Sequence, residues 1–170
     1  LVHADQGESM NPIAELPWTS WLVSQRWYAG RGRTLVSAQP HAVLPLYEGV
    51  DVVVLSARFS DGSTDRYQVV VQWDSQPIAE YGSLATIGRV GEHTAYDAIY
   101  REDSARRLLA LMDRSAVIGE VRFTREPGAV LPVDSASRVL EAEQSNTSVV
   151  FEDQAILKVI RRLSNGINPD

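Results

Sequence analysis

The 170-residue sequence contains no cysteine, which excludes disulfides, thiolate metal sites and a cysteine nucleophile. Its three histidines, His3, His41 and His93, are never spaced at i, i+4, so a histidine-rich zinc site is not expected. Acidic residues outnumber basic ones, 22 against 16, and this balance argues against nonspecific binding to nucleic acid or an anionic membrane. No apolar run approaches the roughly 18 residues of a membrane span. The remaining composition predicts a soluble, cytoplasmic α+β protein.

The N-terminal part is expected to begin with a leader and a helix. Residues 1–11 are polar, and we expect a flexible leader there. Proline suits a first helical turn and Gly30 suits the position just past a helix end, which predicts a helix over Pro17–Ala29. Large side chains recur along it at the spacing of a core-facing stripe: Trp18, Trp21, Leu22, Gln25 and Tyr28.

Extended segments follow this helix. Ala42–Leu46 contains Pro45 and is expected at the edge of a sheet, and Val50–Phe59 is rich in β-branched residues. In Arg66–Asp74 apolar and polar residues alternate, so we expect one face of this strand to be buried against the tryptophan-rich helix. Together these elements predict an N-terminal unit over residues 12–82.

A stretch rich in glycine and proline around residue 82 predicts a boundary, with a second unit over 83–170. Helical spacing is predicted over Thr94–Arg114, and three short strands are predicted at Val139–Glu143, Val149–Glu152 and Ala155–Arg161. The fold class expected is therefore α+β. A helix packs on an antiparallel sheet in the first unit, and a second antiparallel sheet with a helix follows.

Lys158 is unusual for its position. In a strand over Ala155–Ile160, side chains at even positions share one face, so Lys158 falls between Ile156 and Ile160. A lysine stem can pack there while its ammonium reaches water. The same ammonium can instead point at an anionic ligand over the sheet, such as nucleotide phosphates. Spacing alone leaves both interpretations open.

A polar segment is predicted to join two of these strands as a loop: Gln144, Ser145, Asn146, Thr147 and Ser148. Its backbone N–H groups and hydroxyls can cradle phosphate oxygens, although it contains no glycine and is not a Walker A loop. An ordinary hairpin turn is the alternative interpretation. Taken together with Lys158, the segment matches the opening of a protein-kinase-like N-lobe, where a loop covers the phosphates and a strand lysine pairs with them.

The sequence contains two separated signatures. The first is Trp27-Tyr28-Ala29-Gly30-Arg31-Gly32-Arg33, preceded by Trp18–Arg26. The second is Glu143–Val150, with Ile156-Leu157-Lys158 and Asn165–Asp170. In order and spacing the two resemble bacterial maltokinases, and the resemblance covers nearly all of the chain from Leu16 onward.

The resemblance implies an aminoglycoside-phosphotransferase-like kinase fold, with a cap subdomain over 12–82 and a kinase N-lobe-like intermediate subdomain over 83–170. It implies that ATP and Mg²⁺ are used to phosphorylate maltose to maltose 1-phosphate for glycogen synthesis. In that family pattern residues 144–148 form the phosphate loop, and Lys158 pairs with the phosphates. ATP and maltose are the implied substrates, and trehalose synthase, to which related kinases are fused, is a candidate partner.

No catalytic-loop pattern occurs in the sequence. We therefore expect the catalytic aspartate, the Mg²⁺ ligands and the sugar pocket to lie in a C-terminal lobe outside this chain, and the chain alone to be inactive. The alternatives are another sugar kinase of the same superfamily, such as a glucosamine kinase, or a non-catalytic regulatory or interaction module. A cluster of Arg26, Arg31 and Arg33 beside two aromatic residues could suggest nucleic-acid binding, but the acidic balance speaks against it.

Overall fold

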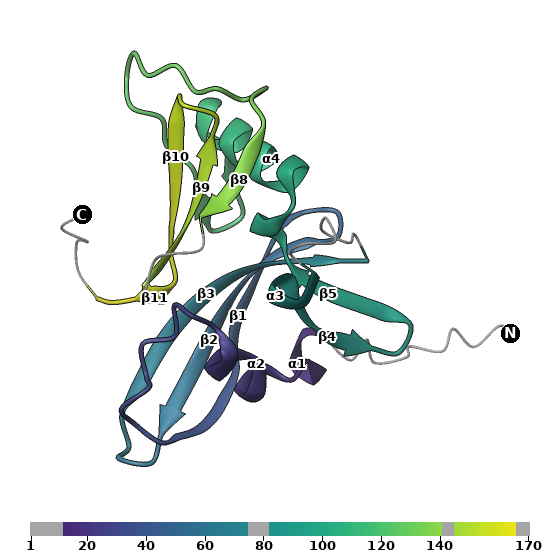
Figure 1. Cartoon of the computed structure of the whole chain (residues 1–170), viewed down its shortest axis with the longest axis vertical. Helices are drawn as coiled ribbons and strands as arrows, with labels where there is room; N and C mark the ends of the chain where they lie inside the picture. Colours follow the sequence, from purple (N-terminus) through teal and green to yellow (C-terminus); the bar gives the residue numbers. More distant parts are fainter. Residues whose placement is uncertain (1–11, 75–81, 141–144, 166–170) are drawn as a thin grey trace, which may run out of the picture.

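A long antiparallel sheet runs through the centre of the protein (Figure 1). The computed structural model describes residues 12–74, 82–140 and 145–165, so the predicted leader lies outside it. The strand order is β1-β2-β3-β5-β4, and β11 pairs with β3 near the start of that strand. The bounds are β1 Leu35–Tyr47, β2 Val50–Phe59, β3 Thr64–Trp73, β4 Thr86–Val90, β5 His93–Asp97 and β11 Arg162–Leu163.

The other elements are short. A three-stranded sheet has the order β10-β9-β8, with β8 at Ser137–Leu140, β9 at Asn146–Phe151 and β10 at Ala155–Ile160. A small hairpin joins β6 Val117–Ile118 to β7 Val121–Arg122. The helices are α1 Pro12–Glu15, α2 Trp18–Ser24, α3 Gly82–Ala85, the 3₁₀ turn Ala98–Tyr100 and α4 Glu102–Asp113. The protein is therefore α+β with antiparallel sheets, which confirms the predicted fold class.

The helix α2 is shorter than predicted, because it ends at Ser24 rather than Ala29. The Trp21 carbonyl oxygen accepts hydrogen bonds from the Ser24 hydroxyl, at 2.6 Å, and from the Gln25 side-chain amide, at 3.2 Å. In a continuing helix this carbonyl would accept from the backbone N–H four residues later. Because the two side chains donate to it instead, the helical hydrogen bonds end there. The predicted stripe is nevertheless correct, because all five of its side chains are buried.

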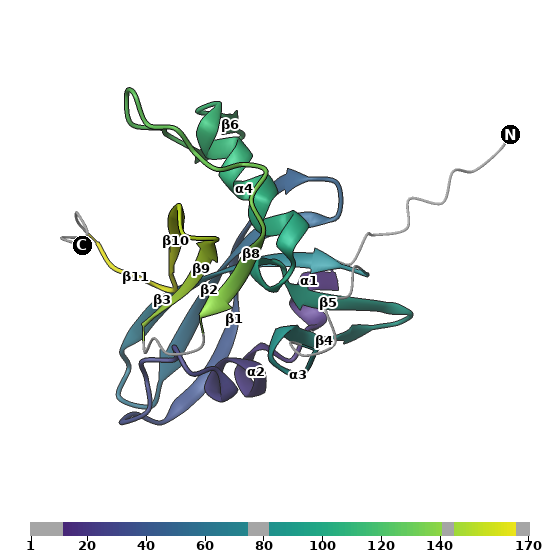
Figure 2. The same ribbon diagram turned by 45° about the horizontal axis from the view of Figure 1, so that its top comes forward.

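The two faces of the long sheet are covered by different layers. Odd-numbered side chains of β2 and β3, such as Val53 and Tyr67, pack against α1, α2 and the segment after α2 in a first hydrophobic cluster. Even-numbered ones, such as Val52 and Val70, belong to a second cluster with α4 and β8–β10. In Figure 2, α2 and α4 lie on opposite sides of the strands. The sequence predicted the first layer but not the second.

The helix predicted over Thr94–Arg114 is wrong in its first part. Residues His93–Asp97 form β5, which pairs with β3 and β4, and α4 begins only at Glu102. Gly91, with φ of 59°, makes the turn between β4 and β5, and this hairpin fixes the following residues as a strand. Pairing with two neighbouring strands therefore outweighs the local helical spacing of Tyr96, Ile99 and Tyr100.

Among the described residues, no helix has both the length and the apolar character that crossing a membrane requires.

Candidate functional site

The three-stranded sheet carries most of the predicted site residues. Its register places Lys158 of β10 opposite Ser148 of β9, which itself lies opposite Leu140 of β8. Residues directly opposite each other in antiparallel strands project to the same face. The fold therefore brings Lys158 and Ser148 onto one face of one sheet.

Lys158 is the only lysine in the sequence, and its side chain is exposed. Ile156, on the same face, is 64% exposed, whereas Leu157 and Val159 turn the other way and pack against the second cluster. Within the described part of the chain, the Lys158 ammonium forms no ion pair with a carboxylate. On β10 this face is exposed at Ile156 and Lys158, so the ammonium can reach an anion without leaving an acidic partner among the residues that the structure describes.

The polar segment is not the loop that the sequence predicts. Asn146, Thr147 and Ser148 are the first three residues of β9 and pair with β10, while Gln144 lies outside the described residues. Thr147 and Ser148 are buried, whereas Ser145 is exposed. Cross-strand pairing opposite the apolar strand β10 extends β9 into residues whose polarity alone suggests a turn.

Arg161, which sequence reasoning missed, is a charged side chain buried beside this sheet together with its partner Asp97. Its side chain is fully buried just after β10. Its Nη2 donates to Asp97 Oδ2 at 2.6 Å, and its Nε donates to Thr147 Oγ1 at 2.8 Å. The guanidinium also lies 4.8 Å from the centroid of the Trp27 ring. The only sequence signal was an arginine directly after an apolar strand, and nothing in the sequence pointed to Asp97 as its partner.

Burial dominates the electrostatics of this pair. It raises the pKa of the Asp97 carboxyl above its ordinary value, although the Arg161 guanidinium opposes the change by favouring the charged form. Removal of one partner of a buried ion pair typically lowers the free energy of unfolding by about 3–5 kcal/mol, because the other charge stays buried without a partner. The pair therefore holds β5 and the end of β10 together as a unit.

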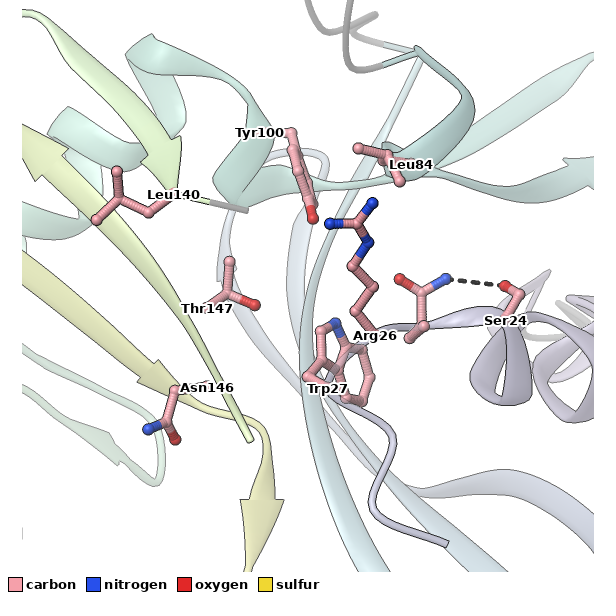
Figure 3. Close-up of a pocket in the computed structure, with 9 residues that line it drawn as sticks. Ser24, Arg26, Trp27, Leu84, Tyr100, Leu140, Asn146 and Thr147 are labelled. Atoms are coloured by element: carbon pink, nitrogen blue, oxygen red, sulfur yellow. Dashed lines mark hydrogen bonds between the residues drawn. The ribbon is translucent and has the colours of Figure 1, made fainter. Parts of the chain in front are cut away.

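A small cavity of about 100 Å³ lies beside this buried pair, between the end of α2 and the start of β9. Figure 3 shows Asn146 and Thr147 on one side of it and Trp27 and Arg26 on the other, with the Arg26 side chain extending toward Tyr100. The remaining lining residues are Ser24, Gln25, Leu84 and Leu140. Within the described ranges, no group of three or more histidine or acidic side chains is placed to hold a metal ion.

The signature Trp27–Arg33 has a structural part in this arrangement. Trp27 and Tyr28 are both buried, and their rings pack against Tyr67 of β3 at centroid distances of 5.9 and 6.0 Å. Arg33 makes an ion pair with Asp65, and Arg31 donates to the Gln25 carbonyl at 2.9 Å. The two aromatic rings are in the core and are not available on the surface for stacking on nucleic-acid bases.

The fold and site define an α+β protein in which a helix-covered antiparallel sheet is joined to a small lysine-bearing sheet. Residues 21–100, just under half of the chain, match the family model of the maltokinase N-terminal cap domain. The matched range includes the Trp27–Arg33 signature and Asp97, and it ends before the sheet that carries Lys158. It supports the cap that the resemblance implies and leaves the kinase-like second unit as a prediction.

The predicted division of the chain at residue 82 also stays a prediction. The matched range runs past that residue, and β4 and β5, which follow it, belong to the same sheet as β1–β3.

Proposed function

We propose that this chain supplies the cap and the nucleotide-binding lobe of an ATP-dependent maltokinase, with cap residues 12–82 and lobe residues 83–170. The observation that carries the proposal is a match to the maltokinase cap domain, followed by the β9–β10 hairpin, whose second strand carries one exposed lysine. Phosphorylation of maltose to maltose 1-phosphate for glycogen synthesis, in the cytoplasm, is part of the same proposal. The proposal also includes trehalose synthase as a partner protein.

Lys158 has the properties that phosphate binding requires. It is a compact, exposed point charge on β10, with no acidic partner in the described residues. Ser145, which directly precedes β9, is exposed, and Ser148 of β9 lies opposite Lys158 on the same face of the sheet. The proposal assigns phosphate contacts to Lys158 and to residues 144–148.

ATP supplies the phosphoryl group and Mg²⁺ neutralises its charge when both are bound. What this chain adds is orientation: we propose that Lys158 and the polar residues 144–148 hold the phosphate tail in one place. We assign the Mg²⁺ ligands, the catalytic aspartate and the sugar pocket to a catalytic lobe beyond this chain.

The single lysine allows a direct binding test. Reductive ¹³C-methylation keeps the positive charge and labels only Lys158 and the N-terminal amine. We expect the Lys158 methyl signal to shift on titration with Mg-ATP and to stay in place with adenosine, which has no phosphates. If the Lys158 methyl signal does not shift with Mg-ATP, or shifts equally with adenosine, the proposed phosphate contact is contradicted and a non-catalytic module is favoured.

Activity is tested in a protein that joins this chain to a catalytic lobe. Lys158→Met is expected to lower kcat/KM for maltose phosphorylation about 10²-fold, because the positive charge that contacts the phosphates in this proposal is lost. Ile156→Met is the matched control, since it puts the same side chain on the same exposed face. Equal activities of the two variants would remove Lys158 from the mechanism. Faster turnover of glucosamine than of maltose would assign the acceptor to the other sugar.

A further inference from the structure

Arg161 joins four separate parts of the fold. It follows β10 directly, and its side chain reaches Asp97 of β5, Thr147 of β9 and the ring of Trp27 in the segment after α2. Two of these partners, Asp97 and Trp27, fall within the range that matches the cap domain, and Thr147 lies in the small sheet. No other side chain that the structure describes as buried and charged spans both sheets.

The backbone of Arg161 makes the same connection. Its carbonyl oxygen accepts from the Gln68 N–H of β3 at 2.8 Å, while its own N–H donates to the Ser145 carbonyl at 3.4 Å. The Gln68 side chain adds a bond to the carbonyl of Ile160 at 2.6 Å. Main chain and side chain therefore both hold the start of β9 to the long sheet.

A contribution to folding stability does not by itself explain why the Arg161 side chain is charged and buried. Buried ion pairs can often be replaced by apolar side chains without loss of stability, whereas the geometry they impose is specific. Here one nitrogen of Arg161, Nη1, and one oxygen of Asp97, Oδ1, have no hydrogen-bond partner in the described residues, which adds to the cost of burial. What the pair does supply is a fixed position for Thr147, the neighbour of Ser148, which faces Lys158.

We propose that Arg161 is a positioning residue that transmits the placement of the cap-matching region, residues 21–100, through its Asp97 and Trp27, to the start of β9 and so to the face that carries Lys158. This inference rests on the proposed function for its consequence, which is that the cap sets nucleotide affinity. The mechanical link itself, by which we mean the contacts from Asp97 and Trp27 through Arg161 to Thr147, lies entirely within this chain. A shift of β5 or of Trp27 moves Arg161, and Arg161 moves Thr147.

The link is tested first without nucleotide. In the double variant Asp97→Leu with Arg161→Met, both charges are replaced by apolar side chains, so that no buried charge is left unpaired. We expect hydrogen exchange of the Asn146, Thr147 and Ser148 amides to accelerate at least about tenfold, because the start of β9 opens locally. Exchange at Val53 and Leu55, in the long sheet, is expected to stay as in the unchanged chain.

The control pair is Arg125 with Asp113, an exposed ion pair at 3.0 Å elsewhere in the fold. Arg125→Met with Asp113→Leu is expected to leave exchange at residues 146–148 unchanged. Unchanged exchange there in the Asp97/Arg161 variant, or equal acceleration at Val53 and Leu55, overturns the link.

A milder pair of variants decides the matter if the double variant does not fold. Thr147→Val keeps the shape of the side chain and the Asp97–Arg161 pair but removes the oxygen that accepts from Arg161 Nε. We expect faster exchange at Asn146 and Ser148 in Thr147→Val and restored protection in Thr147→Ser, which keeps a hydroxyl. Equal exchange in the two variants contradicts the positioning role.

The functional consequence is measured with Mg-ATP and the ¹³C-methyl signal of Lys158. Weakening of the apparent dissociation constant by at least about threefold in the folded variant, compared with the unchanged chain, supports the positioning role. Equal affinity with faster exchange overturns it. If the unchanged chain itself shows no response to Mg-ATP, the proposed function fails, while the exchange experiment still decides the mechanical link.

Discussion

Asp65 shows how single residues tie distant segments of this chain together. Its carboxylate is 8% exposed and receives hydrogen bonds from Arg33, in the segment after α2, and from Arg162 of β11 at 2.9 Å. Burial by itself would raise the pKa of Asp65, but the two arginines hold it below its usual value. Arg162 follows Arg161 directly, so two neighbouring arginines anchor the segment after β10 to the long sheet by different carboxylates.

We predict that Asp65→Asn lowers the free energy of unfolding at pH 7 by about 2–3 kcal/mol, because two hydrogen bonds to a charged group are weakened. Since the folded pKa of Asp65 is depressed, this stability is present above the unfolded pKa of about 3.9 and is lost as the pH falls through the folded value. Urea unfolding of both proteins between pH 7 and pH 3 measures the difference.

That difference between the unchanged chain and Asp65→Asn should stay constant down to about pH 5 and narrow below about pH 4. Asp153→Asn, in the exposed turn between β9 and β10, is the control and is expected to change stability by no more than about 0.5 kcal/mol. A difference for Asp65→Asn that is as large at pH 3 as at pH 7 would show that the ion pairs do not stabilise the fold.

At the scale of elements, the connection between α2 and β1 depends on one close contact. Gly30 is buried, and a Cβ added to it would lie 2.5 Å from the ring of Tyr28 and 2.8 Å from the ring of Phe59. Both rings are themselves buried in the first cluster, so neither has free space to move into. Glycine is therefore required here for the space it leaves. Gly32, two residues later, has open space around it.

We predict that Gly30→Ala lowers the free energy of unfolding by about 1–3 kcal/mol, because the added methyl group overpacks the first cluster. Gly32→Ala is the matched control within the same signature and is expected to stay within about 1 kcal/mol of the unchanged chain. Denaturant midpoints of the two variants decide the matter. Equal midpoints would mean that the segment around Gly30 can move away from Phe59 without lowering the free energy of unfolding.

At the scale of the whole molecule, one sheet serves two hydrophobic clusters. Trp18, Trp21 and Trp27 lie in the first cluster, and the fourth tryptophan, Trp73, packs against it, so tryptophan fluorescence reports on that side alone. Leu109 of α4 lies in the second cluster, on the opposite face. Because β2 and β3 contribute alternate residues to both clusters, loss of one cluster removes support from the other.

We predict that Leu109→Ala lowers the free energy of unfolding by about 2–5 kcal/mol and shifts the fluorescence midpoint as much as the far-UV circular dichroism midpoint. Leu22→Ala, in the first cluster, is the reference for a direct effect on the tryptophans. If the fluorescence midpoint keeps its original value while the dichroism midpoint falls, the two clusters unfold separately.

Local sequence patterns were enough to predict where β2 lies and which face of β3 packs against the tryptophan-rich layer. β2 spans Val50–Phe59 as predicted, and Tyr67 and Val69 of β3 are buried against the tryptophan-rich layer. Such features depend on residues two positions apart, which the sequence displays directly. The position of Lys158 on an even-numbered face followed from the same period.

Contacts between residues far apart in the sequence could not be predicted from local patterns and became visible in the fold. Residues 93–97 became a strand because β3 and β4 offered hydrogen bonds on either side, and Asn146–Ser148 became the start of β9 because β10 lies beside them. Arg161 and Asp97 are 64 positions apart, and a charge is buried only where a distant partner is brought to it. Local spacing carries no record of that partner, so the buried pair had to be seen in the fold.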